Sequence, residues 1–192
     1  KIRDYGYRAI HETAVVAKAL IVAFYGEGPA FSYFASGSNG DRQGLMEAQR
    51  YPEDYDGIIA GCPALDPSGT LPVWAWLQQS MEEPAGAYIT KEKLKTVATA
   101  VLRSCDTLDG VEDGVIDNPR ACYFNPEILS CQREDTAHCL TGPELHSLGN
   151  IYSGNPGATY SQRRRGFEPG GEKGWGDWIT GSGPGQSVQH LY

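Results

Sequence analysis

The sequence predicts an α/β fold with a parallel sheet in its first third, followed by a loop-rich, disulfide-bonded region. Helical and strand patterns alternate over about the first sixty residues, which is typical of a parallel sheet with crossover helices. Four of the five cysteines fall within residues 105–139. Glycine and proline are concentrated in the last forty residues, so that stretch is expected to be mostly loop.

Two helices and two strands are expected in the first part. Apolar side chains recur every three or four positions in residues 7–24, which predicts an amphipathic helix with one buried face. Residues 30–35 and 57–61 are short apolar runs that predict buried strands. The second helix is expected over residues 42–50, because Pro52 disfavours helical geometry in the residue before it.

The pattern changes after Asp66, where we place a boundary between residues 1–66 and residues 67–192. Three helices are expected beyond it, at residues 71–81, 91–103 and 144–152. Thr90 and Thr141 precede the last two and are predicted N-caps, since a threonine hydroxyl can accept a hydrogen bond from a first-turn amide.

The composition narrows the class of partner. Sixteen Lys and Arg stand against 24 Asp and Glu, so the formal net charge is −8. This charge repels phosphate and argues against binding to nucleic acid or to an anionic membrane surface. No apolar run is long enough to cross a bilayer. A substrate that is uncharged, or whose charge is hidden, is the better match.

The clustered cysteines fall into two short intervals, 105–122 and 131–139, which indicates two local disulfides. A zinc site is the weaker alternative, because no Cys-x-x-Cys pair is present and His138 is the one histidine in the cluster. Disulfides imply an oxidising compartment, hence a secreted or periplasmic protein. Cys62 is left over and is expected to be a buried thiol.

Residues 36–40, Ser-Gly-Ser-Asn-Gly, form a relaxed version of the Gly-x-Ser-x-Gly nucleophile elbow. The turn from strand to helix in this motif is so tight that it needs small residues two places either side of the serine. Ser38 would stand at the tip, and the backbone amide of Asn39 at the helix N-terminus could stabilise an oxyanion. Ser- and Gly-rich turns are common in α/β proteins, so the pentapeptide is weak evidence by itself.

Residues 105–116 carry three aspartates, Asp106, Asp109 and Asp113, interleaved with two glycines. Calcium takes six to eight oxygen ligands, and glycines let a loop curl so that carbonyls point inward. The spacing is not that of an EF-hand. The alternative is an ordinary turn with solvated acids, although acids crowded beside cysteines would repel one another.

Together these stretches resemble the tannase and feruloyl esterase family. The resemblance is carried by residues 33–61, 105–124, 167–170 and 174–181, and it covers nearly the whole chain. It implies a partial α/β-hydrolase core with a nucleophile elbow, followed by a segment of the lid domain. It also implies a carboxylic-ester hydrolase that acts on hydroxybenzoate or hydroxycinnamate esters, with Ser38 as nucleophile and an acyl-enzyme intermediate.

The same resemblance implies a structural Ca²⁺ in the lid. By that likeness Asp106, Asp109 and Asp113 supply carboxylates, while Val111 and Val115 supply backbone oxygens. It also supports one disulfide within residues 105–122, joining Cys105 to Cys122, and a second joining Cys131 to Cys139.

Two positions depart from the family pattern. Family members commonly have a cysteine just before the nucleophile, disulfide-bonded to one that follows the catalytic histidine. Here that position is Gly37, so this tether is expected to be absent. Asp41 stands where a glycine is usual, and an acid beside the nucleophile could disfavour an oxyanion.

The histidine and the acid of a catalytic triad are not found by the resemblance, because in the family both follow the lid. His138, His146 and His190 match no family catalytic position, and His11 is expected to pack on the first helix. We therefore expect the chain to be part of a longer hydrolase polypeptide, whose remainder supplies both groups.

Two functions remain open at this point. The first is hydrolysis of a small aromatic ester, in which lid tryptophans could flank the acyl group, although packing in a core is the commoner role of tryptophan. These are Trp74, Trp76, Trp175 and Trp178. The alternative is a non-catalytic, calcium-stabilised binding module on the same scaffold.

Overall fold

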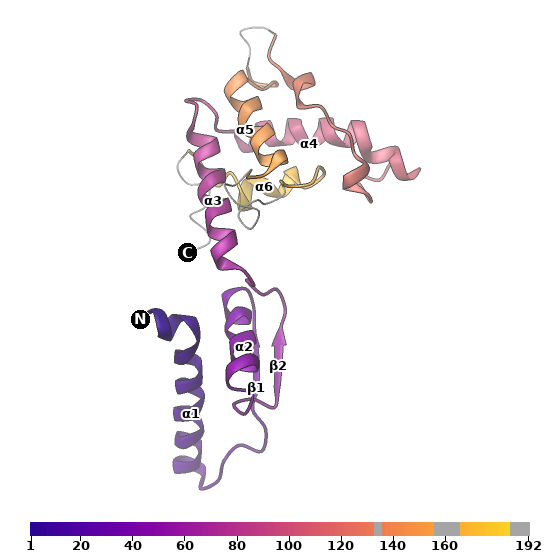
Figure 1. Ribbon diagram of the computed structural model, residues 1–192. Helices are drawn as coiled ribbons and strands as arrows, with labels where there is room; N and C mark the ends of the chain where they lie inside the picture. The colour runs from indigo at the N-terminus through magenta and orange to yellow at the C-terminus, as the bar shows by residue number, and fades with distance from the viewer. Residues whose placement is uncertain (133–135, 156–165, 185–192) are drawn as a thin grey trace. The chain divides into compact units, whose positions relative to one another are not determined.

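The computed structural model describes residues 1–132, 136–155 and 166–184. By contacts between residues the chain divides into two compact units, Lys1–Pro67 and Ser68–Tyr192, which we call the N-terminal and C-terminal units. Each is described by itself (Figure 1).

The N-terminal unit contains the expected order of helix, strand, helix and strand. Its elements are the π-helix η1 (Asp4–Arg8), α1 (Ala9–Tyr25), β1 (Tyr33–Ser36), α2 (Asn39–Arg50) and β2 (Gly57–Ala60). The two strands pair in parallel, with Tyr33 opposite Gly57 and Ser36 opposite Ala60. The predicted parallel crossover through a helix is therefore confirmed.

Helix α2 packs directly on this sheet because position 44 is glycine. A Cβ at Gly44 would lie 3.0 Å from ring carbons of Phe34 and 3.1 Å from a methyl carbon of Ile58. Position 44 thus lies close to both strands, and a larger side chain there would require Phe34 and Ile58 to shift. At its N-terminal end, α1 continues from η1, and Gly26 ends it with φ 86° while donating its amide to Val22 O.

Burial in this unit differs from the prediction. The strands were expected to be buried, but Tyr33 is 70% and Ile59 69% exposed. Ala14 is the one fully buried residue of α1, and Phe24 near its C-terminal end is exposed. The physical reason is that the described part of this unit holds two strands only, so no second layer covers these apolar faces.

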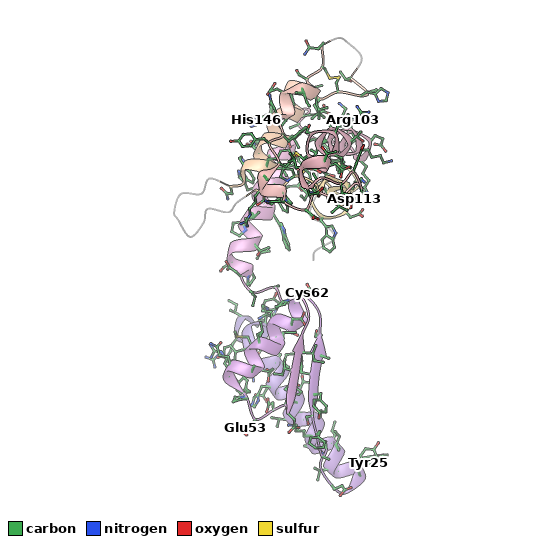
Figure 2. All side chains as sticks on the ribbon, turned by 90° about the vertical axis from the view of Figure 1, so that its right-hand side faces the viewer. Tyr25, Glu53, Cys62, Arg103, Asp113 and His146 are labelled. Carbon is green, nitrogen blue, oxygen red and sulfur yellow. A yellow bond between two sulfur atoms is a disulfide. The ribbon has the colours of Figure 1, made fainter. Side chains whose placement is uncertain are left out.

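The expectation of a buried Cys62 is also wrong, because the thiol is exposed. Cys62 follows β2 in a turn, where the chain leaves the sheet (labelled in Figure 2).

The C-terminal unit is helical and closes around an apolar core. Its helices are α3 (Pro67–Glu82), α4 (Lys91–Cys105), α5 (Gly142–Ser153) and α6 (Glu172–Trp178), with 3-10 turns η2 (Asp106–Asp109), η3 (Pro119–Ala121) and η4 (Pro126–Leu129). Side chains from all four helices meet in the core, including Leu77, Val97, Leu148 and Trp175.

Both predicted N-caps are confirmed. Thr90 accepts a hydrogen bond from the Lys93 amide at the start of α4. Thr141 forms a reciprocal capping box with Glu144 at the start of α5. The helix α6 was not predicted, since residues 172–178 were expected to be loop. Its seven residues include two glycines and show no helical period, and burial of Trp175 against the core stabilises it.

Both predicted disulfides are present, joining Cys105 to Cys122 and Cys131 to Cys139. The two disulfides exclude the zinc site, because each of the four sulfurs is bonded to its partner cysteine and none remains as a thiolate ligand. In the part of the chain that the structure describes, no helix combines the length and apolarity that a membrane span requires.

Candidate active site

Ser38 lies on a sharp turn between β1 and α2. Its backbone has φ 57° and ψ −118°, and among the described residues it is the one non-glycine with positive φ. Such a conformation costs about 1–3 kcal/mol and persists only where the surroundings enforce it. The side chain is exposed and caps no amide of α2, so its hydroxyl faces away from the packed interior of the unit.

The neighbours of Ser38 are small because the turn leaves no room. A Cβ at Gly40 would stand 1.7 Å from the Ser36 hydroxyl oxygen and 2.9 Å from the Ser36 Cβ. Gly40 also donates its amide to Gly37 O at 3.0 Å, which closes the turn. Asn39 is the first residue of α2, where the backbone amide has no partner within the helix.

The turn after β2 fastens the elbow from the other side. Ala64 donates its amide to Ser38 O at 3.2 Å, and Cys62 donates its amide to Asp41 Oδ2 at 2.7 Å. Asp41 is fully buried, and its other oxygen has no hydrogen-bond partner in the described part of the chain. The acid that departs from the family pattern therefore joins α2 to the segment after β2.

Arg42 fixes the start of α2 to the N-terminal segment, a role that the sequence analysis missed. Its guanidinium donates to Asn39 Oδ1 at 2.7 Å, to Gly6 O at 3.1 Å and to Tyr5 O at 3.0 Å. It also lies 4.7 Å from the Tyr5 ring centroid. The available signal in the sequence was an arginine in the first helical turn after a nucleophile motif.

A second polar cluster lies toward the other end of α2. His11 Nδ1 is 2.6 Å from Asp54 Oδ2, and the imidazole stacks on the Tyr51 ring with centroids 3.9 Å apart. Glu47 completes the group. Burial, followed by the hydrogen bond and charge of the Asp54 carboxyl, raises the pKa of Glu47 to about 7.

This histidine–aspartate pair is not positioned to serve Ser38. Glu47 follows Ser38 by nine residues, which places it roughly 13 Å further along α2 at 1.5 Å per residue. Sequence analysis gave His11 a packing role and did not single out Glu47 or Asp54. The separation of the three along the chain hid the cluster.

The remaining candidate residues lie in the C-terminal unit. His146 is exposed and contacts the Asn150 side chain at 3.3 Å (labelled in Figure 2), His138 is also exposed, and His190 lies outside the described residues. Trp175 is buried in the core of the C-terminal unit, and Trp74 and Trp76 are partly buried and pack against that core. Trp178 is exposed. Three of the four tryptophans therefore have the packing role.

The acidic loop begins at the end of α4, beside the Cys105–Cys122 disulfide (Figure 2 labels Asp113). Asp106 is buried and accepts the Gly114 amide through both oxygens, at 3.0 and 3.1 Å. Asp109 accepts the Val111 amide at 2.8 Å, and Asp113 accepts the Val115 amide at 3.0 Å. The three carboxylates hold the loop by these hydrogen bonds.

These carboxylates have the chemistry that calcium prefers but do not converge. Within the described ranges, one group of three or more His, Cys, Asp or Glu brings its ligand atoms within 4.8 Å of one another, and it is the group of His11, Glu47 and Asp54. Asp106, Asp109 and Asp113 are not so close. As it stands, the loop is not a closed calcium cage.

Comparison with known proteins places this geometry in context. A family model described as tannase and feruloyl esterase matches residues 1–185. An uncharacterized esterase of Xanthomonas campestris pv. campestris is 38% identical over 187 residues, which cover 95% of this chain and 32% of that protein. A probable feruloyl esterase B-2 of Aspergillus oryzae is 36% identical over 155 residues, 79% of this chain and 29% of that protein. The chain thus spans about a third of the length of these curated relatives.

Solved structures of a feruloyl esterase and a tannin acyl hydrolase also resemble this chain. Feruloyl esterase B from Aspergillus oryzae matches with a TM-score of 0.74 and 31% identity, over 97% of this chain and 38% of that chain. Tannin acyl hydrolase from Aspergillus niger matches with a TM-score of 0.58 over 86% of this chain and 32% of that chain. At 22% identity, the second likeness concerns the fold alone.

Proposed function

This chain belongs to the tannase and feruloyl esterase family, and from that premise we propose that it carries the nucleophile segment of a serine carboxylic-ester hydrolase. The N-terminal unit is then part of an α/β-hydrolase core, and the C-terminal unit is a segment of its lid. The substrates are esters of hydroxybenzoic or hydroxycinnamic acids, a choice supported by relatives named as feruloyl esterases. The rest of the polypeptide is the partner that completes the site.

The observation that carries this proposal is the backbone of Ser38. A positive φ at a non-glycine residue, between a parallel strand and a helix, is the conformation that exposes a nucleophilic hydroxyl on an elbow. Hydrogen bonds from both flanks maintain it, through Gly40 and Ala64. An ordinary connecting turn has no need of this strain.

In the proposed reaction, Ser38 Oγ attacks the ester carbonyl carbon while a histidine from the remaining polypeptide takes its proton. The carbonyl oxygen becomes an oxyanion, which the Asn39 amide stabilises at the N-terminus of α2. The histidine then donates this proton to the ester oxygen as the C–O bond breaks, so that a neutral alcohol leaves and the acyl group stays on Ser38. Water hydrolyses this acyl-enzyme and releases the aromatic acid.

A fluorophosphonate probe tests the nucleophile in the complete protein. We expect wild-type protein to be labelled at Ser38 and to hydrolyse methyl ferulate or methyl gallate. Ser38→Ala should abolish labelling and lower kcat by about 10³-fold or more, because the acyl-enzyme cannot form. Ser36→Ala is the matched control: it removes a hydroxyl from the same turn, and labelling should persist. A folded wild-type protein that is not labelled would favour the non-catalytic binding module instead.

We also propose that Ca²⁺ orders the acidic loop, with ligands from Asp106, Asp109 and Asp113 and from the backbone oxygens of Val111 and Val115. The acid-rich sequence and the glycines at positive φ, Gly110 and Gly114, support this proposal. Binding requires the carboxylates to draw together from their present positions. The role is structural, since the ion would hold the lid loop.

Thermal unfolding with and without a chelator tests the calcium proposal. Ca²⁺ at about a hundred times its Kd should stabilise the wild-type protein by roughly 2.7 kcal/mol. Asp113→Asn should lose most of this gain, whereas Glu112→Gln, an exposed acid of the same loop, should keep it. An unchanged melting temperature in calcium-free and calcium-loaded protein contradicts the site.

Both disulfides support an oxidising location, secreted or periplasmic.

A further inference from the structure

Three metal-ligand side chains meet inside the N-terminal unit, away from Ser38. His11 comes from α1, Glu47 from α2 and Asp54 from the turn before β2. Each offers one ligand atom, and these atoms all lie within 4.8 Å of one another. Glu53, which Figure 2 labels, marks the turn that carries the third ligand. The group therefore joins three segments that are separate in sequence.

Glu47 is the unexplained member of this cluster. It is 0% exposed, and neither carboxylate oxygen accepts a hydrogen bond from a donor in the described residues. Its carboxyl can hydrogen-bond to that of Asp54 only while one of the two keeps a proton. A buried carboxylate with no compensating group is costly, so the site calls for a positive charge, either a proton or a metal ion.

The nearby cationic side chains in the described residues form their hydrogen bonds with groups other than the Glu47 carboxylate. The Lys18 ammonium donates to the backbone oxygen of Asp54 at 2.5 Å, and the Arg42 guanidinium binds Asn39, Tyr5 and Gly6. His11 offers one imidazole, and its Nδ1 already contacts Asp54. Two adjacent carboxyls therefore share one ionisable ring.

We propose that His11, Glu47 and Asp54 bind one divalent cation of the borderline class, such as Zn²⁺ or Mn²⁺. One imidazole nitrogen with two carboxylates is a donor set that these ions accept, whereas Ca²⁺ and Mg²⁺ favour oxygen ligands alone. Ligand atoms around a tetrahedral Zn²⁺ stand about 3.3 Å apart. The contact between His11 and Asp54, now 2.6 Å, has to open by less than about 1 Å to admit the ion.

The surroundings favour a fixed site. Stacking on Tyr51 holds the imidazole plane, with an interplanar angle of 10°. His11 is partly exposed, which leaves a path for the ion to enter. The ion would tie α1, α2 and the turn before β2 together in a unit whose one buried apolar side chain, among described residues, is Ala14. Its role is structural and independent of the ester chemistry at Ser38.

The test uses metal-free protein that carries Cys62→Ser, because an exposed thiol also binds Zn²⁺. The protein is titrated with Zn²⁺ by calorimetry and with Co²⁺ by visible absorption, whose intensity reports the coordination geometry of the bound ion. Thermal unfolding with and without Zn²⁺ gives an independent readout. Glu47→Gln keeps the shape of the side chain and should lower Zn²⁺ affinity at least about tenfold. Glu53→Gln, one residue from Asp54 but exposed, should bind as the parent does.

The outcomes separate a metal from a shared proton. If a metal binds, Zn²⁺ raises the melting temperature of the parent and of Glu53→Gln, and it raises that of Glu47→Gln clearly less or not at all. His11→Gln, at a partly exposed position, should lose both the Zn²⁺ effect and the Co²⁺ absorption, and it serves if Glu47→Gln does not fold. The proposal is overturned if the parent binds neither ion, or if Glu47→Gln and His11→Gln bind as tightly as the parent.

Discussion

In the C-terminal unit the side chains removed from solvent are mostly apolar, whereas in the N-terminal unit they are Asp41, Arg42, Glu47 and Asp54, with Ala14 as the one apolar exception among described residues. The C-terminal unit adds two disulfides to its core. The N-terminal unit leaves apolar faces of α1 and of both strands exposed.

The difference shows that the two units depend on different forces. Apolar burial, at about 25 cal/mol per Å², is the main stabilising contribution inside the C-terminal unit. The N-terminal unit holds its elbow through directional polar contacts, as Arg42 and Asp41 show. Its exposed apolar faces are the surfaces on which a further layer of a longer polypeptide could pack.

Leu148→Ala should produce the largest loss of stability. Leu148 is fully buried among helices of the C-terminal unit, so truncation removes apolar contacts and leaves a cavity. We expect the free energy of unfolding to fall by about 2–5 kcal/mol, measured by denaturant titration with tryptophan fluorescence. Leu108→Ala, at a 59% exposed site of the same unit, should change it by no more than about 0.5 kcal/mol. Equal losses in both variants would contradict the closed core.

Removing the disulfide between Cys105 and Cys122 should cost about 3 kcal/mol, because the bond closes a loop with a sequence separation of 17. The double substitution to serine is measured in the same titration. Removing the bond between Cys131 and Cys139, with a separation of 8, should cost less. A larger loss from the shorter loop would show that loop entropy is not the main contribution.

Arg42→Ala should lower the free energy of unfolding of the N-terminal unit by about 1.5–3 kcal/mol, because a charged donor is lost and two backbone oxygens lose their partner. Hydrogen exchange should rise in residues 5–8 and at the start of α2, while the C-terminal unit keeps its protection. Arg50→Ala is the control: it lies on an exposed face of α2, where its contact is with the Tyr7 ring. Uniform exchange throughout the chain would argue against a local anchor.

What could be predicted from the sequence is what depends on near neighbours. The caps at Thr90 and Thr141 need residues three positions away, and the disulfides join cysteines in short intervals. The order of helices and strands in the N-terminal unit follows from local periodicity. The bend at Ser38 was also expected from its small neighbours, although its chemical role stays a proposal.

Burial and distant partners could not be predicted in this way. An apolar strand reads as buried whether or not a layer covers it, and Ile59 shows that here none does within the described residues. Cys62 was assigned by its residue type, but its position in a turn decides its exposure. His11 is separated from Glu47 by 36 positions and from Asp54 by 43, so no window of sequence brings them together.

The smallest effect is expected at the exposed face of α1, where Leu20 is 64% exposed. Leucine and lysine have similar helix propensities, so Leu20→Lys changes polarity with little change in backbone preference. In the 192-residue chain we expect the free energy of unfolding to change by no more than about 0.5 kcal/mol. In a polypeptide of the length of the relatives, a layer packed on α1 would bury this position, and the same substitution should cost about 2–3 kcal/mol or more. Comparable small effects in both proteins would mean that α1 keeps this face in solvent, and the apolar surface of the N-terminal unit would then need another explanation.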